Sequence, residues 1–330
     1  TTKVHIKNNR WAAGSFPNTP EGEEVFTITQ ERFDTTIADF PDVNGRLTTF
    51  IDWDTDNFNE SMKDADVLLC WNLPTDSLRE VAPNLKWIHC IGAGVEHMLP
   101  MNWLPEDVVL TNNKGVHAAK AGEFGLMSIL MLHTHMPAVV TNQRNNVYDS
   151  LYASPIEGKT LVVIGTGSLG GSAAKKLQEL GVHVIGVNNR GRPVDGCDEI
   201  VTTDQLDSVL PRADYVLCAT PDTPGTRGLL DKRRLDLLKA TAGIVNIGRE
   251  AVMDYDALCD KLEERSLAGA ILDVFDPEPI DENSRLWGTK NLIITPHISA
   301  DDGDAYIPMT LGLFFAIWRC SGRKTTAQPH

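Results

Sequence analysis

The stretch from Thr160 to Arg190 constrains the fold most, because it reads as strand, glycine turn, helix and second strand. A short apolar run rich in β-branched residues, at 160–164, is typical of a buried parallel strand. Gly165-Thr166-Gly167-Ser168-Leu169-Gly170 follows and fits G-x-G-x-x-G. Apolar residues at helical spacing then continue to Gly181, which can cap the helix, and a second apolar run occupies 182–187. This order of elements is the context in which a glycine turn binds a dinucleotide.

Each glycine of the turn has its own role in that prediction. Gly165 permits the tight turn, Gly167 lets the backbone approach a pyrophosphate, and Gly170 lets the helix pack closely on the strand. Ser168 and Leu169 lie at the start of the helix, whose N-terminus attracts an anion. A G-x-G-x-x-G sequence alone often marks only a structural turn, but here the flanking elements favour a nucleotide site.

The residues after the second strand predict which dinucleotide binds. A fold of this kind that uses NAD places Asp or Glu there, on the ribose 2′-hydroxyl. This chain has Asn188, Asn189 and Arg190, followed by Arg192. A neutral amide does not repel a 2′-phosphate, and a guanidinium can bind it through two hydrogen bonds. The sequence therefore predicts NADP(H) as the preferred cofactor, with NAD(H) at lower affinity; the alternative is that both arginines are solvated loop charges.

Length and charge disfavour several classes of protein. The chain has 330 residues, enough for two domains. Its 30 basic and 45 acidic residues give a net charge of −15, which argues against nucleic acid or an anionic membrane as a partner. An acidic surface is also expected of a protein from a salt-loving (halophilic) source, and ordinary solubility explains it as well.

The cysteines and the hydropathy pattern bear on location. Six cysteines are scattered without a C-x-x-C pair, several of them in apolar runs, which suits a reducing cytosol and predicts no metal site. No charged-then-apolar leader is visible at Thr1, and no apolar stretch reaches about 18 residues. We therefore expect a cytoplasmic protein that does not span a membrane.

The rest of the chain reads as alternating strands and helices, which predicts an α/β protein with doubly wound parallel sheet. Apolar runs of strand length lie at 3–7, 24–29, 47–53, 66–70, 85–90, 108–112, 215–220, 243–248, 268–274 and 292–295. The segment from Ala121 to Met136, ended by Pro137, is apolar on nearly every face and is expected to be a buried helix. A subunit interface would cover such a helix, and a two-fold dimer is the commonest arrangement; a helix central to one large core is the alternative.

Three predicted strand ends in the nucleotide half carry ionisable residues: Arg249, Glu278 and His297. A guanidinium can hold the carboxylate of a 2-oxo acid and polarise its carbonyl. A histidine can supply a proton to the developing alkoxide near neutral pH, and a carboxylate beside it orients the ring and favours its charged form. Taken singly, each residue has an ordinary structural explanation. Together, after a nucleotide fold, they predict hydride exchange with a 2-oxo acid.

Two loops in the first part of the chain are candidates for substrate binding. Trp71-Asn72-Leu73 follows a predicted strand, at the edge where open α/β sheets place ligands. Gly92-Ala93-Gly94 is a second glycine turn, which is either an anion site on bare amides or a plain connection. Trp53 and His117 are further candidates for the pocket, whose size the sequence leaves open.

These motifs resemble those of the D-isomer-specific 2-hydroxyacid dehydrogenases. The resemblance rests on the turn 165–170, on Val245-Asn246-Ile247-Gly248-Arg249, on 272–279 and on Thr295-Pro296-His297-Ile298-Ser299, within a match over about residues 66 to 300. It implies an NADP(H)-dependent enzyme that reduces 2-oxo acids to D-2-hydroxy acids. Arg249 would bind and polarise the substrate, His297 would be the acid/base, and Glu278 would be its partner.

The resemblance also implies further contacts. Asp273 would approach the nicotinamide carboxamide, and the amides of Ala93 and Gly94 would meet the substrate carboxylate. Asn188 departs from the acidic residue of NAD-dependent members, and Ala121 stands where many members carry Thr. The other residues expected to line the cofactor are Ser168, Leu169, Thr220, Pro221, Thr226, Ile247, Gly248 and Ser299, together with Arg249 and His297.

The family's architecture implies two doubly wound parallel-sheet domains. A flavodoxin-like substrate-binding domain would comprise 1–103 and 301–330, with a Rossmann dinucleotide-binding domain inserted at 104–300. A homodimer built through the cofactor domains is implied as well. The resemblance leaves two other functions open. One is phosphite oxidation, which uses the same Arg, Glu and His set. The other is nucleotide-sensing corepression, which would be expected to have a peptide-binding cleft, and nothing in residues 1–100 suggests one.

Overall fold

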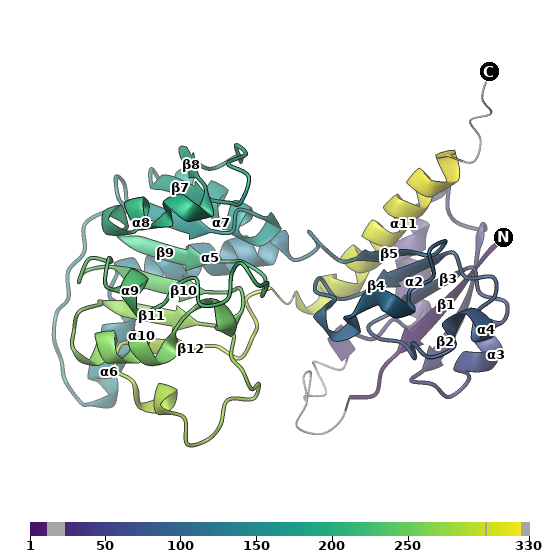
Figure 1. Cartoon of the computed structure of the whole chain (residues 1–330), viewed down its shortest axis with the longest axis horizontal. Helices are drawn as coiled ribbons and strands as arrows, with labels where there is room; N and C mark the ends of the chain where they lie inside the picture. The colour runs from purple at the N-terminus through teal and green to yellow at the C-terminus, as the bar shows by residue number, and fades with distance from the viewer. Residues whose placement is uncertain (12–23, 301, 325–330) are drawn as a thin grey trace. The chain divides into compact units, whose positions relative to one another are not determined.

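The protein folds into two compact units, seen in Figure 1. The computed structural model describes residues 1–11, 24–300 and 302–324. Unit 1 contains Thr1–His117 and Asp302–His330, and unit 2 contains Ala118–Asp301. Each unit is built on a parallel sheet of its own, which confirms the predicted α/β class with two parallel-sheet domains.

Unit 1 is built on a five-stranded sheet of order β2-β1-β3-β4-β5, the strand order of flavodoxin-like folds. Its strands are β1 (Thr2–Asn8), β2 (Leu47–Trp53), β3 (Val67–Cys70), β4 (Trp87–Cys90) and β5 (Val109–Asn112). Helices α2 (Gln30–Ala38) and α11 (Tyr306–Lys324) contribute to the apolar cluster on one face. Helices α3 (Phe58–Met62) and α4 (Leu78–Val81) contribute to the cluster on the other.

Helix α11 joins the end of the chain to the first sheet. Tyr306, Phe314 and Phe315 are fully buried, and the Phe314 ring stacks on Trp87 with a centroid distance of 4.7 Å. Burial of each large apolar side chain stabilises the fold by roughly 1.5–3 kcal/mol. The first and last segments of the chain therefore share one unit, as the predicted inserted arrangement requires.

Unit 2 is built on a seven-stranded parallel sheet of order β12-β11-β10-β9-β6-β7-β8, the doubly wound order of dinucleotide-binding folds. Its strands are β6 (Thr160–Ile164), β7 (His183–Val187), β8 (Glu199–Val201), β9 (Tyr215–Cys218), β10 (Gly243–Asn246), β11 (Gly269–Leu272) and β12 (Leu292–Ile294). Its helices are α5 (Ala118–His133), α6 (Met136–Arg144), α7 (Ser168–Gln178), α8 (Leu206–Val209), α9 (Lys232–Leu235) and α10 (Tyr255–Glu263).

The helices of unit 2 begin and end at residues suited to those positions. Asp254 caps α10, because its side chain accepts a hydrogen bond of 2.9 Å from the backbone N–H of Ala257. Gly181 follows α7 with a φ of +77°, a conformation that favours glycine, as the sequence predicts. Helices α5 and α7 contribute to the apolar cluster on one face of the sheet, and α8 and α10 to the cluster on the other.

Three sequence expectations are wrong in detail. The boundary expected at 103/104 lies at 117/118, because β5 pairs with β4 in the sheet of unit 1. The strand expected at 24–29 does not form; the backbone N–H and C=O of Ile28 instead bond the side chain of buried Asn8, at 2.9 and 3.0 Å. The helix expected to end at Pro137 ends at His133, and Pro137 lies in the first turn of α6.

The length and hydropathy of the helices indicate whether any of them could cross a membrane. Within the described part of the chain, no helix is by itself long and apolar enough to cross a membrane. Helices α5 and α6 meet that criterion only when taken together, and they are bent by 66° where they meet.

Candidate active site

The glycine turn after β6 has the geometry expected of a pyrophosphate-binding turn. Gly165 has a φ of +93°. A Cβ on Gly170 would lie 2.0 Å from the carbonyl oxygen of Gly165, so only glycine allows this close packing of helix on turn. A Cβ on Gly167 would meet no atom within 4 Å. Gly167 is the N-cap of α7 and has no side chain to cap the helix, which suits approach of an anion.

The loop after β7 is organised by Asn188. Its Oδ1 accepts hydrogen bonds of 3.1 Å from the backbone N–H groups of Arg190 and Arg192. Its Nδ2 donates to Oγ1 of Thr166 at 3.1 Å, which ties the loop to the glycine turn. Asn189 accepts from Thr203 at 2.7 Å. Arg190 and Arg192 are both exposed and make no ion pair within the described ranges.

The ends of β9 and β10 form the next part of the same sheet edge. A Cβ on Gly248 would lie 2.5 Å from the backbone oxygen of Thr220, so the two loops touch at this glycine. Thr226 Oγ1 donates to the carbonyl of Pro221 at 2.6 Å and shapes the loop after β9. The buried hydroxyl of Thr220 has no hydrogen-bond partner among the described residues. Ile247 is buried beside this loop.

Arg249 is presented by a turn that Asn246 stabilises. Nδ2 of Asn246 donates to the carbonyl of Arg249 at 3.0 Å, and its Oδ1 accepts from the N–H of Gly248 at 3.0 Å. Nδ2 also donates to the Tyr255 hydroxyl at 3.0 Å, and that hydroxyl donates to the carbonyl of Val274 at 2.8 Å. The ends of β10 and β11 are thereby joined to α10. Sequence reasoning missed Tyr255, which no motif marks, and quoted Asn246 without a role.

His297 and Glu278 lie together, as the sequence predicts for this pair. Nδ1 of His297 and Oε2 of Glu278 are 2.8 Å apart, and the backbone N–H of Phe275 donates to Oε1 of Glu278 at 2.8 Å. The bond between Nδ1 and Glu278 fixes the orientation of the imidazole ring. Arg249 is near enough for its charge to act on both residues.

Opposing effects set the ionisation of this pair. Burial by itself lowers the pKa of His297, but the hydrogen bond and charge of Glu278 and the charge of Asp273 outweigh it, so that the pKa is raised above 6.5. Burial raises the pKa of Glu278, and the hydrogen bond and charge of His297 reverse that effect, so that the pKa lies below 4.5. The site therefore favours a protonated histidine beside an ionised carboxylate.

Asp273 fixes the loop that carries His297. It is fully buried, and its Oδ1 accepts from Oγ1 of Thr295 at 2.6 Å and from the N–H of Ile298 at 2.9 Å. Its Oδ2 accepts from the N–H of Ser299 at 2.9 Å. These bonds hold His297 in the left-handed region with a φ of +54°, a conformation that non-glycine residues adopt at some energetic cost. The nicotinamide contact predicted for Asp273 stays a prediction.

The substrate-binding residues predicted in the first part of the chain belong to unit 1. The loop Trp71-Asn72-Leu73 follows β3, and Trp71 stacks on His97 with an interplanar angle of 13°. A Cβ on Gly92 would lie 3.1 Å from the Trp71 ring, so this loop packs against the turn Gly92-Ala93-Gly94. Nδ2 of Asn112 donates to the carbonyl of Ala93 at 2.7 Å. Both loops lie at the carboxyl ends of parallel strands, where ligands bind in such sheets.

Comparison with known proteins agrees with this geometry. Residues 126–299 match the family model described as "D-isomer specific 2-hydroxyacid dehydrogenase, NAD binding domain". A glyoxylate reductase of Thermofilum pendens is 30% identical over 251 residues, which cover 73% of this chain and 74% of that protein. The chain belongs to the D-isomer-specific 2-hydroxyacid dehydrogenase family. It is thus an NAD(P)-dependent oxidoreductase that acts on CH–OH groups.

Solved structures share the fold over nearly the whole chain. A D-isomer-specific 2-hydroxyacid dehydrogenase family protein of Aeromonas salmonicida superposes with a TM-score of 0.76 at 25% identity, covering 100% of this chain and 97% of the other. An NADPH-dependent glyoxylate/hydroxypyruvate reductase of Sinorhizobium meliloti, in complex with NADP and sulfate, superposes with a TM-score of 0.74 at 24% identity, covering 100% and 96%.

Proposed function

We propose that this protein reduces 2-oxo acids to D-2-hydroxy acids with NADPH. The observation that carries the proposal is the 2.8 Å contact between His297 and Glu278, within electrostatic range of Arg249, at the carboxyl edge of a dinucleotide-binding sheet. That set supplies a cation for a carboxylate and an acid for an alkoxide. The relative from Thermofilum pendens is named a glyoxylate reductase, which supports a 2-oxo acid substrate.

The residues of unit 2 fit a phosphorylated dinucleotide. The open approach at Gly167 and the uncapped start of α7 suit a pyrophosphate, and the free hydroxyl of Thr220 suits a polar ligand group. Arg190 and Arg192, which form no ion pair with any residue in the described ranges, would bind a 2′-phosphate. The neighbour from Sinorhizobium meliloti binds NADP, which supports the preference for NADP(H) over NAD(H).

The chain's own groups account for substrate orientation and proton transfer. When bound, the reduced nicotinamide supplies the hydride that reaches the carbonyl carbon. Arg249 holds the substrate carboxylate and polarises the carbonyl. His297 donates the proton on Nε2 to the developing alkoxide, while Glu278 keeps the ring oriented through Nδ1 and stabilises its charge. In the oxidative direction His297 accepts the hydroxyl proton.

We further propose a cytoplasmic homodimer formed through unit 2. Large apolar side chains are exposed on α5 and on the segment after α6: Met127, Val147, Tyr148, Leu151 and Tyr152. Exposed apolar groups of this size commonly mark an interface. Sedimentation should give twice the 36.3 kDa chain mass, and Tyr148→Asp with Tyr152→Asp should shift the protein toward the monomer.

The activity test is direct. NADPH oxidation is followed with pyruvate, glyoxylate and hydroxypyruvate, and the lactate and glycerate formed from pyruvate and hydroxypyruvate are resolved on a chiral column. Phosphite with NADP+ tests the alternative reaction. D-2-hydroxy acid formed with NADPH supports the proposal. Failure to reduce any 2-oxo acid, or formation of the L-isomer, contradicts it.

A further inference from the structure

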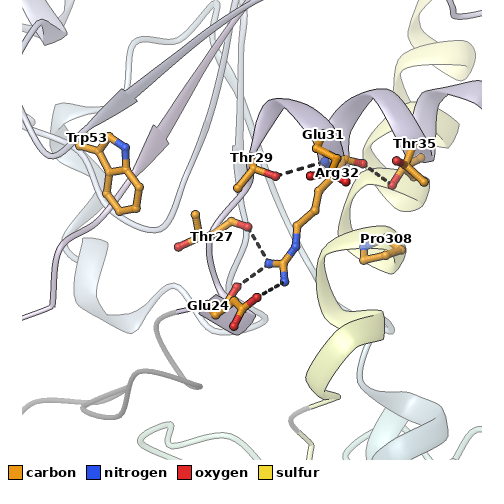
Figure 2. A pocket seen from close by; sticks show the side chains of 9 residues that line it. Glu24, Thr27, Thr29, Glu31, Arg32, Thr35, Trp53 and Pro308 are labelled. Carbon is orange, nitrogen blue, oxygen red and sulfur yellow. Dashed lines mark hydrogen bonds and ion pairs between the residues drawn. The ribbon is translucent and has the colours of Figure 1, made fainter.

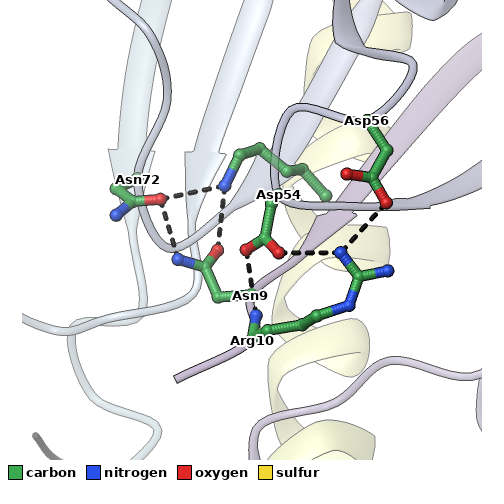
Figure 3. Close-up of polar contacts among 6 residues, drawn as sticks. Asn9, Arg10, Asp54, Asp56 and Asn72 are labelled. Carbon is green, nitrogen blue, oxygen red and sulfur yellow. Dashed lines mark hydrogen bonds and ion pairs between the residues drawn. The ribbon is translucent and has the colours of Figure 1, made fainter. Parts of the chain in front are cut away.

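Lys7 is a buried cation in β1, at the carboxyl edge of the sheet in unit 1, and is 4% exposed. Its Nζ donates hydrogen bonds of 2.9 Å to Oδ1 of Asn9 and 2.9 Å to Oδ1 of Asn72. Asn9 and Asn72 face each other in Figure 3, and Nδ2 of Asn9 donates to Oδ1 of Asn72 at 2.9 Å. Two neutral oxygens thus bind an ammonium that has three donors.

Asp54 and Asp56, two acidic residues of unit 1, are bound to another cation. Figure 3 shows Arg10 between Asp54 and Asp56, with Nη1 of Arg10 2.9 Å from a carboxylate oxygen of each. Lys7 itself forms no ion pair with any residue that the structure describes. Burial lowers the pKa of Lys7, and the charge of Asp54 opposes this only in part. Because buried lysines are usually paired, an anion brought to this ammonium gains a strong interaction.

The ammonium lies close to the turn expected to bind the substrate carboxylate. Only β3 separates β1 from β4 in the sheet, so the ends of β1 and β4 are roughly 10 Å apart. Lys7 reaches across to Asn72, in the loop after β3, and the preceding residue Trp71 packs against Gly92. Lys7 is therefore one loop away from the turn Gly92-Ala93-Gly94.

A different pocket in unit 1 gives a weaker case. It encloses about 600 Å³ and is lined by Thr27, Thr29, Trp53 and others (Figure 2). Among the described residues that line it, the cation is Arg32, which already donates to the backbone carbonyl of Thr27 at 2.9 Å and lies 3.7 Å from the carboxylate of Glu24. Because this guanidinium already bonds a carbonyl and lies near a carboxylate, we expect it to bind a ligand weakly. Lys7, by contrast, uses two of its three N–H donors among the described residues.

We propose that Lys7 recognises a second anionic group on the substrate, so that this enzyme prefers dianionic 2-oxo acids. The proposal rests on the proposed function, because it assigns to Lys7 the binding of the second anionic group of the same substrate. It predicts that wild-type protein favours oxaloacetate over 4-methyl-2-oxopentanoate, in which an isopropyl group replaces the carboxylate. A charge-assisted hydrogen bond corresponds to roughly 10–100-fold in kcat/KM. Phosphohydroxypyruvate against hydroxypyruvate tests a phosphate in place of the carboxylate.

The decisive variant is Lys7→Met, which keeps the length of the side chain and removes the charge. The ratio of kcat/KM for oxaloacetate over 4-methyl-2-oxopentanoate should fall about 10–100-fold, through KM, and Lys7→Arg should restore most of it. The matched control is Lys3→Met, on the same strand, whose side chain is 42% exposed and lies 3.1 Å from Asp64. This control should leave the ratio as in wild type.

A structural role for Lys7 makes a different prediction. If the ammonium only ties Asn9 to Asn72, Lys7→Met lowers kcat/KM for both substrates by one factor, and the proposal is overturned. Should Lys7→Met fail to fold, Asn72→Asp decides instead, because a carboxylate at that position neutralises the ammonium and should abolish the preference. A preference that survives Asn72→Asp overturns the proposal.

The two proposals fail in distinguishable ways. If 2-oxo acids are reduced with no preference for the dianion, Lys7 is not a specificity residue and the proposed function stands. If no 2-oxo acid is reduced, the proposed function fails, and ligand binding then tests whether Lys7 recognises an anionic group. In that case oxaloacetate, but not 4-methyl-2-oxopentanoate, should raise the thermal unfolding temperature of wild-type protein and not of Lys7→Met. Equal effects on both proteins contradict the assignment.

Discussion

The two units hold a histidine in opposite surroundings. In unit 1, the ring nitrogens of fully buried His89 lie 2.8 Å from Oγ1 of Thr111 and 3.1 Å from Oδ1 of Asn113, and burial lowers its pKa to about 4. In unit 2, His297 bonds Glu278, and its pKa is raised although burial opposes this. Neutral partners keep a buried imidazole uncharged, whereas an anionic partner makes it a proton donor at neutral pH.

Backbone geometry separates the same two residues. His89 lies inside β4, where the sheet bonds on both sides fix an ordinary extended conformation. His297 has a positive φ, and the hydrogen bonds that the backbone N–H groups of Ile298 and Ser299 donate to Asp273 hold its loop in place. A conformation maintained against its intrinsic preference is typical of functional sites. We therefore expect substitution of the two histidines to affect different properties.

The largest expected effect is on catalysis by the His297→Asn variant. Loss of a general acid should lower kcat/KM for 2-oxo acid reduction roughly 10²–10⁴-fold. His89→Gln keeps a hydrogen-bonding side chain in unit 1 and should remain within about threefold of wild type at neutral pH, since the ring of His89 bonds the side chains of Thr111 and Asn113 within that unit. Steady-state kinetics with NADPH measure both. If His297→Asn keeps the kcat/KM of wild type, His297 is not the acid, and the proposed functional difference between His297 and His89 is wrong.

The second effect is on stability in acid. The pKa of His89 is about 4 in the folded protein and 6.5 when unfolded, so below pH 6.5 the unfolded chain binds the proton more readily. Stability due to this residue is complete above pH 6.5 and is lost between pH 6.5 and 4, by up to about 3 kcal/mol. The buried His5, whose pKa is also lowered, acts in the same direction.

Urea unfolding from pH 7 to 4.5 measures this loss in wild type and in the His89→Gln variant. Tryptophan fluorescence reports mainly on unit 1, which holds every tryptophan except Trp287. The variant should show a shallower dependence on pH. His297 acts in the opposite sense, because a raised pKa stabilises the fold in acid and that contribution is lost as pH rises. An unchanged slope in His89→Gln would show that His89 does not control acid stability.

A third comparison concerns the cations of the two units. Lys7 in unit 1 is buried, whereas Arg190 and Arg192 in unit 2 are exposed, and their backbone N–H groups donate hydrogen bonds to Asn188. Replacement of both arginines by alanine should raise KM for NADPH about 10–100-fold, because charge-assisted bonds to the 2′-phosphate are lost. KM for NADH should change little, and Arg212→Ala, at an exposed ion pair elsewhere in unit 2, serves as control. Equal effects on both cofactors would contradict NADP recognition by this loop.

The smallest expected effect sharpens the assignment of Glu278. In the proposed reaction His297 must be protonated for reduction, so the rate is expected to fall as pH rises through the pKa of that residue. Glu278→Gln keeps the hydrogen bond and removes the charge that raises this pKa. The alkaline limb of kcat/KM should therefore move to lower pH. A pH profile identical to that of wild type would assign Glu278 a purely structural role.

Much of unit 2 could be predicted because its evidence is local in the sequence. The turn 165–170 contains its own glycines, and the strands on either side are short apolar runs. The pairing of Glu278 with His297 could also be expected, since parallel strands end at one edge and both residues follow strands in the motif. The roles of Asn246 and Tyr255 were not predicted, because their hydrogen bonds join separate elements and no spacing in the sequence indicates such bonds.

Unit 1 could be predicted less completely. The apolar run at 24–29 resembles a strand, but its backbone is satisfied by the side chain of Asn8, which only the folded chain brings there. The strand at 109–112 was expected, but it was assigned to the wrong sheet. Pairing with β4 in unit 1 and pairing with a strand of unit 2 would leave the same apolar pattern in the sequence. Lys7 looks in the sequence like any lysine after apolar residues.

The sequence by itself determined the α/β class, the dinucleotide turn and the residue types needed for proton transfer, because these depend on periodicity, backbone freedom and chemical function. The tertiary structure alone decided the surroundings of Lys7 and His89. Lys7 bonds two side-chain amides, and His89 bonds the neutral side chains of Thr111 and Asn113. Burial and neighbouring charge set the energy of an ion, and both depend on contacts between segments far apart in the chain.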